Sequence, residues 1–124
     1  MRGQPTDEYV SLKHIDFHWG AKVCSADVCL KYKDGEYCIK ARGDGQYDAF
    51  MKAVYRIYGA RGKSLATLTN YAVAIPPGGR TDAFVQTIIT WSYKGKSFRT
   101  TGLDADQTEA AIKATIKMLN LIAS

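Results

Sequence analysis

The chain is poor in the residues on which metal centres, disulfide frameworks and membrane anchors depend. Its 124 residues include only two histidines, three cysteines and three prolines. The cysteines form no Cys-x-x-Cys pair, which argues against structural zinc, and their odd number means that they do not all pair. Arg2 is not followed by the apolar stretch of a secretory signal, so we expect reduced cysteines in a cytoplasmic protein. No apolar run approaches the roughly 18 residues of a membrane span.

Signatures of catalysis are equally scarce. The sequence has no phosphate-binding loop, no dinucleotide fingerprint and no Gly-x-Ser-x-Gly motif. His14, Asp16 and His18 would share one face of a strand, but no further ligand accompanies them, so we predict neither a metal nor a cofactor. A small enzyme that uses Cys38 or these histidines is one alternative function.

Basic residues exceed acidic ones, 17 to 12, but they are scattered along the chain instead of clustered. This charge, together with eight tyrosines and a sheet-and-helix pattern, leaves a nucleic-acid-binding module as a second alternative. The expected last helix opens with Asp104, Asp106 and Glu109, which would repel phosphate. We therefore expect no nucleic acid and no membrane among the partners.

The first half of the chain has strand periodicity followed by helix periodicity. Apolar residues alternate over residues 22–32 and 36–41, on either side of a hairpin turn signal at Asp34-Gly35. Residues 9–17 form a weaker strand pattern. Helical spacing then runs over residues 49–58, where Gly59 is expected to end the helix in the left-handed conformation.

The second half repeats this plan, with strands expected over residues 65–75, 85–93 and around 98–100. A last helix follows, for which Asp106 and Glu109 are typical of an N-capping pair. Gly35 lies 60 residues before Gly95, and the stretch at residues 46–49 lies 61 residues before its counterpart. We predict an α+β fold of duplicated βββα units, about 8–59 and 65–122, within one domain (8–124) after a linker (1–7). Antiparallel sheets would carry helices on one face, and a homodimer would cover what one unit leaves exposed.

Two connections from strand to helix are the most informative segments, at residues 42–48 and 102–107. Backbone N–H groups at a helix start bind carboxylates, and Asp48 beside the first start could hold an ammonium group. Together these groups suit the head group of an amino acid. Ordinary helix capping explains the same residues without a ligand.

Four motifs in order resemble the C-terminal regulatory domain of 2-isopropylmalate synthases and citramalate synthases. The first is Gly43-Asp44-Gly45-Gln46-Tyr47-Asp48-Ala49 with Lys52-Ala53. Gln46 stands where the family often has proline. The other three are Leu68-x-x-Tyr71-x-Val73, Gly79-x-Thr81-Asp82-Ala83-x-Val85, and the stretch from Gly102 to Asn120.

The resemblance implies a feedback sensor that dimerises and binds leucine or isoleucine near the dimer interface. The parent enzyme would join acetyl-CoA to a 2-oxo acid in a separate catalytic domain, so this chain alone is not expected to be an enzyme. The bulk of Ile75 and Val85 slightly favours isoleucine, hence a citramalate synthase, with leucine and a 2-isopropylmalate synthase as the alternative. The implied ligand contacts are Tyr47, Asp48, Leu68, Tyr71, Ile75, Thr81, Val85, Ala105 and Gln107.

Overall fold

The computed structural model describes residues 9–75 and 84–123, which form two compact units. The first unit reaches Lys63 and the second spans Ser64–Ile122. The predicted α+β fold of repeated βββα units is confirmed. The elements are β1 (Ser11–Gly20), β2 (Val23–Tyr32), β3 (Gly35–Gly43), α1 (Gln46–Ala60), β4 (Thr67–Ala74), β5 (Val85–Tyr93), β6 (Lys96–Asp104) and α2 (Gln107–Ala123).

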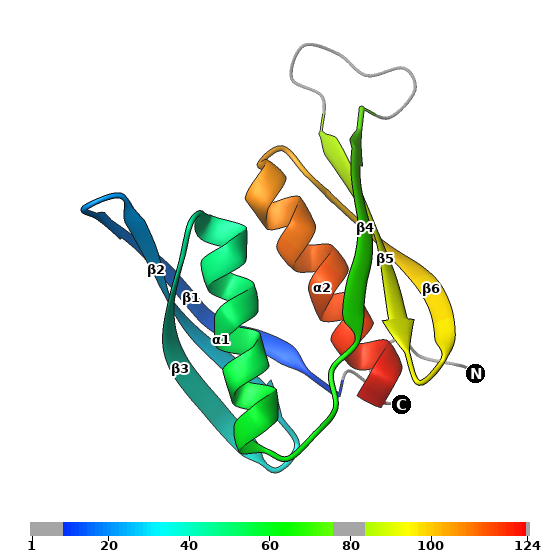
Figure 1. Ribbon diagram of the computed structural model, residues 1–124, viewed down its shortest axis with the longest axis horizontal. Helices are drawn as coiled ribbons and strands as arrows, with labels where there is room; N and C mark the ends of the chain where they lie inside the picture. Colours follow the sequence, from blue (N-terminus) through cyan, green and yellow to red (C-terminus); the bar gives the residue numbers. More distant parts are fainter. Residues whose placement is uncertain (1–8, 76–83, 124) are drawn as a thin grey trace. The chain divides into compact units, whose positions relative to one another are not determined.

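In the first unit, an antiparallel sheet in the order β1-β2-β3 carries α1 on one face (Figure 1). The helix packs on β2 and β3. Alternate residues of β2 face it and are buried, as the period-two pattern predicts. This core consists of Cys24, Ala26, Val28 and Leu30 from the sheet, and Ala49, Phe50, Ala53, Val54, Ile57 and Tyr58 from the helix.

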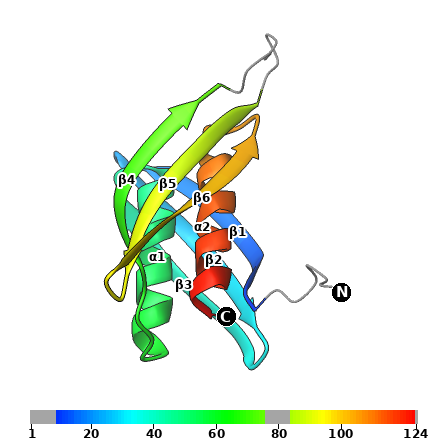
Figure 2. The ribbon, with the colours of Figure 1, turned by 90° about the vertical axis from the view of Figure 1, so that its right-hand side faces the viewer.

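In the second unit, α2 lies along a sheet in the order β4-β5-β6 (Figure 2). A buried hydrogen-bond chain joins the sheet to the helix. The Trp91 indole N–H donates to Thr100 Oγ1 over 2.9 Å, and that hydroxyl donates to the Ala114 carbonyl over 2.7 Å. Gly102 lets the two elements approach, because a Cβ there would meet the backbone of Ala110 and Ala114.

The duplication extends to an irregularity within the sheets. The pairing of β1 with β2 shifts register between Leu12 and His14, and that of β4 with β5 shifts between Leu68 and Asn70. Leu12 pairs with Leu30, and its counterpart Leu68 pairs with Trp91. The first strand of each unit therefore has a bulge directly after the equivalent leucine, Leu12 in β1 and Leu68 in β4.

The register also corrects the predicted alignment of the two halves. Tyr32 pairs with Gly35 and Tyr93 pairs with Lys96, so the counterpart of Gly35 is Lys96 and not Gly95. From the second strand onward one offset of 61 residues holds, whereas Leu12 and Leu68 differ by 56. The segment from this leucine to its partner on the next strand is thus five residues longer in the second half.

The predicted end of the first helix is wrong. Gly59 lies inside α1, the C-cap is Arg61 in right-handed conformation, and Gly62 takes the left-handed one with φ of 67°. The Lys63 N–H donates to the Tyr58 carbonyl and the Gly62 N–H donates to that of Gly59. These two bonds form a Schellman motif, which satisfies carbonyls that the helix end would leave open.

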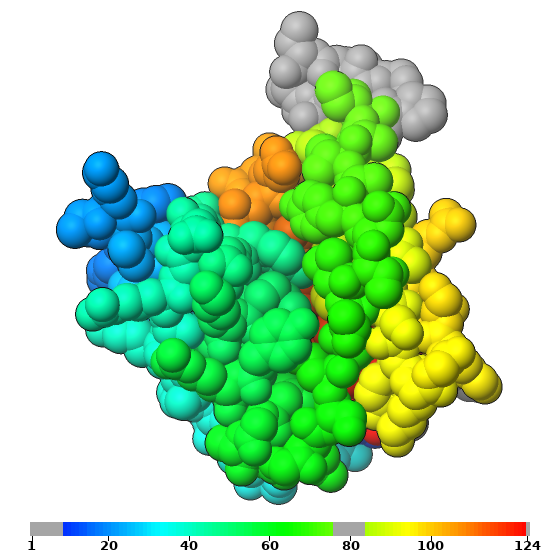
Figure 3. Space-filling view, viewed as in Figure 1, coloured from blue at the N-terminus to red at the C-terminus, as the bar shows by residue number. Residues whose placement is uncertain are grey.

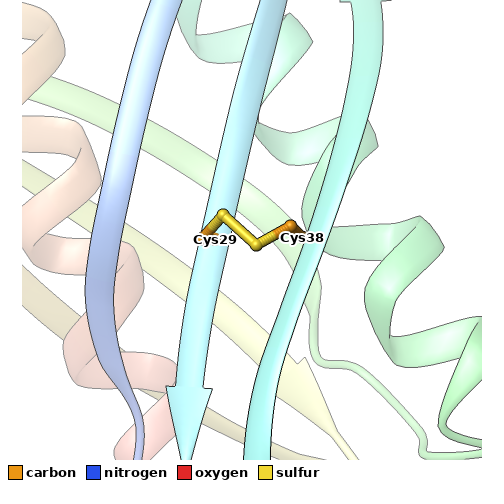
Figure 4. Close-up of a disulfide and its surroundings, with 2 residues drawn as sticks. All are labelled: Cys29 and Cys38. Carbon is orange, nitrogen blue, oxygen red and sulfur yellow. A yellow bond between two sulfur atoms is a disulfide. The ribbon is translucent and has the colours of Figure 1, made fainter.

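The expectation of reduced cysteines is wrong for two of the three. Cys29 and Cys38 are directly opposite in the β2–β3 pairing and form a disulfide (Figure 4). Only Cys24 is a free thiol, and burial raises its pKa. Cys38 is therefore not an available nucleophile in this oxidised form.

His14, Asp16 and His18 do share a face of β1, as the spacing predicts. His18 Nε2 lies 3.3 Å from Asp16 Oδ2 and 3.7 Å from Asp27 Oδ2 on the exposed face of the sheet. Within residues 9–75 and 84–123, no group of three His, Cys, Asp or Glu side chains is arranged to hold a metal ion. Among the same residues, no helix is long and apolar enough to cross a membrane.

Candidate functional site

The start of α1 is formed by the connection that the sequence motif marks. Gly43 allows close approach, because a Cβ there would meet the backbone N of Ala49 and lie 2.6 Å from Asp48 Oδ2. The N-cap residue is Gly45, in extended conformation and with no side-chain cap. This helix start therefore lacks the side-chain acceptor that Ser, Thr, Asp or Asn would supply at the N-cap.

Asp48 closes the connection from within the first turn of α1. Its Oδ2 accepts the Asp44 N–H over 2.9 Å and lies 3.2 Å from Lys52 Nζ. The Asp44 hydrogen bond, with help from Lys52, lowers the pKa of Asp48. Asp48 is half-exposed, so a ligand ammonium could reach it only in competition with Lys52.

The start of α2 is capped by its own side chains. Asp106 Oδ1 accepts the Glu109 N–H over 3.0 Å, which confirms half of the predicted capping pair. The other half is replaced, because the Asp106 N–H donates to Asp104 Oδ1 over 2.9 Å. Lys113 Nζ lies 2.8 Å from Asp104 Oδ2, and this hydrogen bond is the main cause of the lowered pKa of Asp104.

The implied apolar contacts of the second unit lie on one face of its sheet. Leu68 and Tyr71 are three residues apart, so a regular strand would place them on opposite faces. The bulge after Leu68 returns Tyr71 to the same face, where it pairs with Ile89. Val85 alternates with Ile89 along β5 and therefore faces the same way, toward α2.

These residues do not all gather at one point of the second unit. Val85 pairs with Asp104 at the end of the sheet from which α2 begins. Leu68 pairs with Trp91, six residues further along β5, which is about 20 Å at roughly 3.3 Å per residue. One amino acid does not span that distance, so Leu68 and Val85 of one unit do not contact the same small ligand.

The face of β4 presents apolar side chains to solvent. Tyr71 is 36% exposed, Val73 42% and Ile75, directly after the strand, 72%. Figure 3 shows β4 as a green ridge at the surface. Ile75 is therefore not a core residue, and this strand offers apolar area for a ligand or for a second chain.

The remaining implied contacts have varied surroundings. Tyr47 is half-buried, with its ring centroid 6.0 Å from that of Phe50. Ala105 and Gln107 are exposed at the start of α2. Thr81 lies outside the described residues. Tyr47 and Asp48 belong to the first unit, whereas all the others belong to the second.

One residue on this face carries no sequence signal. Thr87 is fully buried between Val73 and Gly102 in the sheet register, and its hydroxyl has no hydrogen-bond partner in the described part of the chain. An unpaired buried hydroxyl typically costs about 1–3 kcal/mol. The sequence could not indicate that Thr87 is buried and unpaired, because threonine is common at both buried and exposed strand positions.

The chain as a whole matches a known family of regulatory domains. The family described as the LeuA allosteric (dimerisation) domain matches residues 1–123. The chain therefore belongs to this family, and the resemblance predicted from the four motifs is confirmed.

The chain is also similar to curated 2-isopropylmalate synthases. The chain is 28% identical over 122 residues to a 2-isopropylmalate synthase of Photobacterium profundum, a match that covers 94% of the chain and 22% of the synthase. It is 32% identical over 117 residues to that of Shewanella piezotolerans, with 93% and 21% covered. The chain spans about a fifth of the length of these enzymes and corresponds to their regulatory part.

Proposed function

We propose that this chain is the effector-binding, dimerising part of an acetyl-CoA-dependent acyltransferase, and that it binds a branched-chain amino acid. The observation that carries the proposal is the match of residues 1–123 to an allosteric domain family. The catalytic domain of the parent enzyme would be its partner, and the homodimer would be its working form. A biosynthetic role of this kind would place it in the cytoplasm.

The polar end of the effector suits the start of α1 better than that of α2. Gly45 leaves α1 without a side-chain cap, whereas Asp106 caps α2. A ligand carboxylate at α1 would meet backbone N–H donors and the positive end of the helix dipole. Asp48 would hold the ammonium group in exchange for Lys52.

The exposed face of β4, taken within the second unit alone, offers apolar area that would suit a branched side chain. Tyr71 and Val73 offer a wall of branched-ligand size, with Ile75 and Val85 beyond them. Leucine and isoleucine differ only in the position of one methyl group, for which a pocket discriminates by about 1–3 kcal/mol. Since the relatives compared above are named 2-isopropylmalate synthases, we now favour leucine over the isoleucine that the bulk of Ile75 and Val85 suggested.

Calorimetric titration of the chain with each of the twenty amino acids tests this proposal. We expect heat of binding from leucine or isoleucine and none from acidic or basic amino acids. At about 100 times Kd, linkage raises the free energy of unfolding by about 2.7 kcal/mol, which a melting curve detects. If neither amino acid binds at millimolar concentration, the sensor proposal fails.

Substitutions at Asp48 separate a ligand contact from a capping residue. Asp48→Asn keeps an acceptor for the Asp44 N–H but removes the charge that an ammonium group needs. We expect it to weaken effector binding at least tenfold with little loss of stability. Lys52→Gln, which removes the competing ammonium, should strengthen binding. Unchanged affinity in both variants would leave Asp48 with the capping role alone.

Substitutions on the β4–β5 face test whether the apolar area of the second unit contributes to effector binding. Tyr71→Ala should weaken binding by about 1–3 kcal/mol and reduce discrimination between leucine and isoleucine, because it opens the wall. Thr87→Val keeps the shape and removes the unpaired hydroxyl. Because Thr87 is fully buried, we expect this variant to raise stability and to leave effector affinity unchanged.

A further inference from the structure

The disulfide of the first unit lies on the sheet face that α1 leaves uncovered. Cys24, Ala26, Val28 and Leu30 point toward the helix, so Cys29 points the other way. Its partner Cys38 is exposed, and Cys29 is partly so. The bond bridges β2 and β3 in the middle of the sheet, with β1 passing beside Cys29 (Figure 4).

The surroundings of this bond are open to a small reagent. A shallow hollow over it is lined by Asp27, Lys40 and His14 together with both cysteines. His14 is the β1 residue opposite Cys29, and Lys40 follows Cys38 on the same face. The charged groups beside a thiolate formed here would be the Lys40 ammonium, which favours a thiolate, and the Asp27 carboxylate 3.9 Å from that ammonium, which opposes it.

The third cysteine provides a contrast within the same sheet. Cys24 is fully buried under α1, and its pKa is raised by burial. Reactivity of cysteine follows exposure and thiolate character. The chain therefore contains one accessible pair and one inert thiol that serves as an internal reference.

We propose that Cys29 and Cys38 form a reversible redox site, which a dithiol reduces while the protein stays folded. A thiolate of the dithiol attacks the exposed Sγ of Cys38, the Cys29–Cys38 bond breaks, and Cys29 leaves as a thiolate that takes up a proton. The second thiol of the reagent then attacks the mixed disulfide and releases Cys38, which is protonated in turn. The dithiol loses two electrons and two protons to become a cyclic disulfide, and the protein gains two thiols.

Reduction should be reported by the stability of the first unit. The bond joins two residues nine positions apart in the sequence, and opening it returns freedom to the unfolded state. The β2–β3 ladder on either side remains paired, so the fold should persist. We expect the melting temperature to fall by about 5–10 °C on reduction.

Differential alkylation read by mass spectrometry tests the assignment of this redox site. The protein is treated with iodoacetamide before and after incubation with dithiothreitol, in buffer without denaturant. We expect no labelling of Cys29 or Cys38 before reduction, labelling of both after it, and labelling of Cys24 only in denaturant. Removal of the reductant in air should restore the unlabelled pair.

Two variants complete the test. A Cys29→Ala, Cys38→Ala double variant should melt like the reduced protein and ignore dithiothreitol, whereas Cys24→Ala should keep the full response. Labelling of the pair without reductant, or reduction only in denaturant, would overturn the proposal. So would a melting temperature that stays the same when mass spectrometry shows that the pair is reduced.

Discussion

At the scale of single residues, the junction between β6 and α2 requires glycine because the helix backbone lies too close for a Cβ atom. A Cβ at position 102 would collide with the Ala110 carbonyl and lie 2.8 Å from the Ala114 N. Both contacts are to the backbone, which does not swing aside. The motif resemblance identified this glycine, but the reason for it is visible only in the packed structure.

We therefore predict that Gly102→Ala lowers the free energy of unfolding by about 3 kcal/mol or more, since overpacking against flexible side chains already costs about 1–3 kcal/mol. Urea denaturation measures the loss. Gly20→Ala is the matched control, because no atom lies within 4 Å of a Cβ there. A similar loss in both variants would contradict the collision argument.

The carboxylate of Asp104 should make stability depend on pH in the acidic range. Its pKa is lowered by the Lys113 hydrogen bond and then by the Asp106 N–H. A carboxyl whose pKa is lower in the folded state stabilises above its unfolded pKa, near 3.9, and loses this effect as pH falls through the folded value.

We expect Asp104→Asn to be less stable than the parent chain at pH 6–7, with the difference closing as the pH falls below about 4. Urea denaturation across that range gives the comparison. Lys113→Gln, which removes the partner, should show the same closing difference. A gap that stays constant down to pH 2 would mean that the pair contributes nothing through its charge.

At the scale of elements, two different hairpins each have a two-residue turn with both residues in the left-handed region. Ala21 and Lys22 join β1 to β2 with φ of 46° and 69°, whereas Lys94 and Gly95 join β5 to β6 with φ of 52° and 80°. The left-handed region costs a residue with a Cβ roughly 1 kcal/mol, and glycine far less. The first turn therefore carries strain at a position where the second has glycine.

Replacing Ala21-Lys22 by Asn-Gly should raise the free energy of unfolding by about 1 kcal/mol, because this pair is the preferred one for such turns. Gly95→Ala should lower it by about the same amount. Thermal denaturation monitored by circular dichroism compares the three proteins. A loss of stability in the Asn-Gly variant would show that these side chains stabilise the turn in another way.

Most elements could be predicted because periodicity reports burial directly. The alternation in β2 and the helical spacing in α1 mark residues that the structure buries, and β5 has the predicted bounds. The helix end was missed because Gly59 and Gly62 both fit a cap, and only the hydrogen bonds from Gly62 and Lys63 distinguish them.

The disulfide was missed because the missing secretory signal indicated reduced cysteines, and because the turn signal lies one residue away from the observed turn. A turn centred on Asp34-Gly35 would pair Cys29 with Lys40, whereas the observed turn at Lys33-Asp34 pairs Cys29 with Cys38. The bulge after Leu68 also left no sequence signal, yet it decides which face Tyr71 occupies. The motifs could therefore name the candidate site residues, but they could not show which face of the sheet each side chain occupies.

At the scale of the whole molecule, exposed apolar side chains support the predicted homodimer. Trp19 is 62% exposed, Ile75 72% and Phe84 51%, in addition to the β4 face. The family is described as a dimerisation domain. If the chain associates in this way, its stability will depend on protein concentration.

Light scattering of the chain should give twice its mass of 13.7 kDa. The melting temperature should rise with protein concentration, because unfolding separates the two copies. A single mass of one chain at all concentrations, with a constant melting temperature, would contradict the dimer.

The corresponding bulges in β1 and β4 also indicate the order in which features of the two halves arose. If both descend from one ancestral gene segment, a bulge acquired after its duplication would be present in only one copy. Its presence after Leu12 and again after Leu68 places its origin before that event. The five additional residues between β4 and β5 occur in one copy only, so they record a later insertion or deletion. The two halves thus share an older skeleton and differ in the length of this one connection, which in the second half contains Thr81, one of the residues implied in effector recognition.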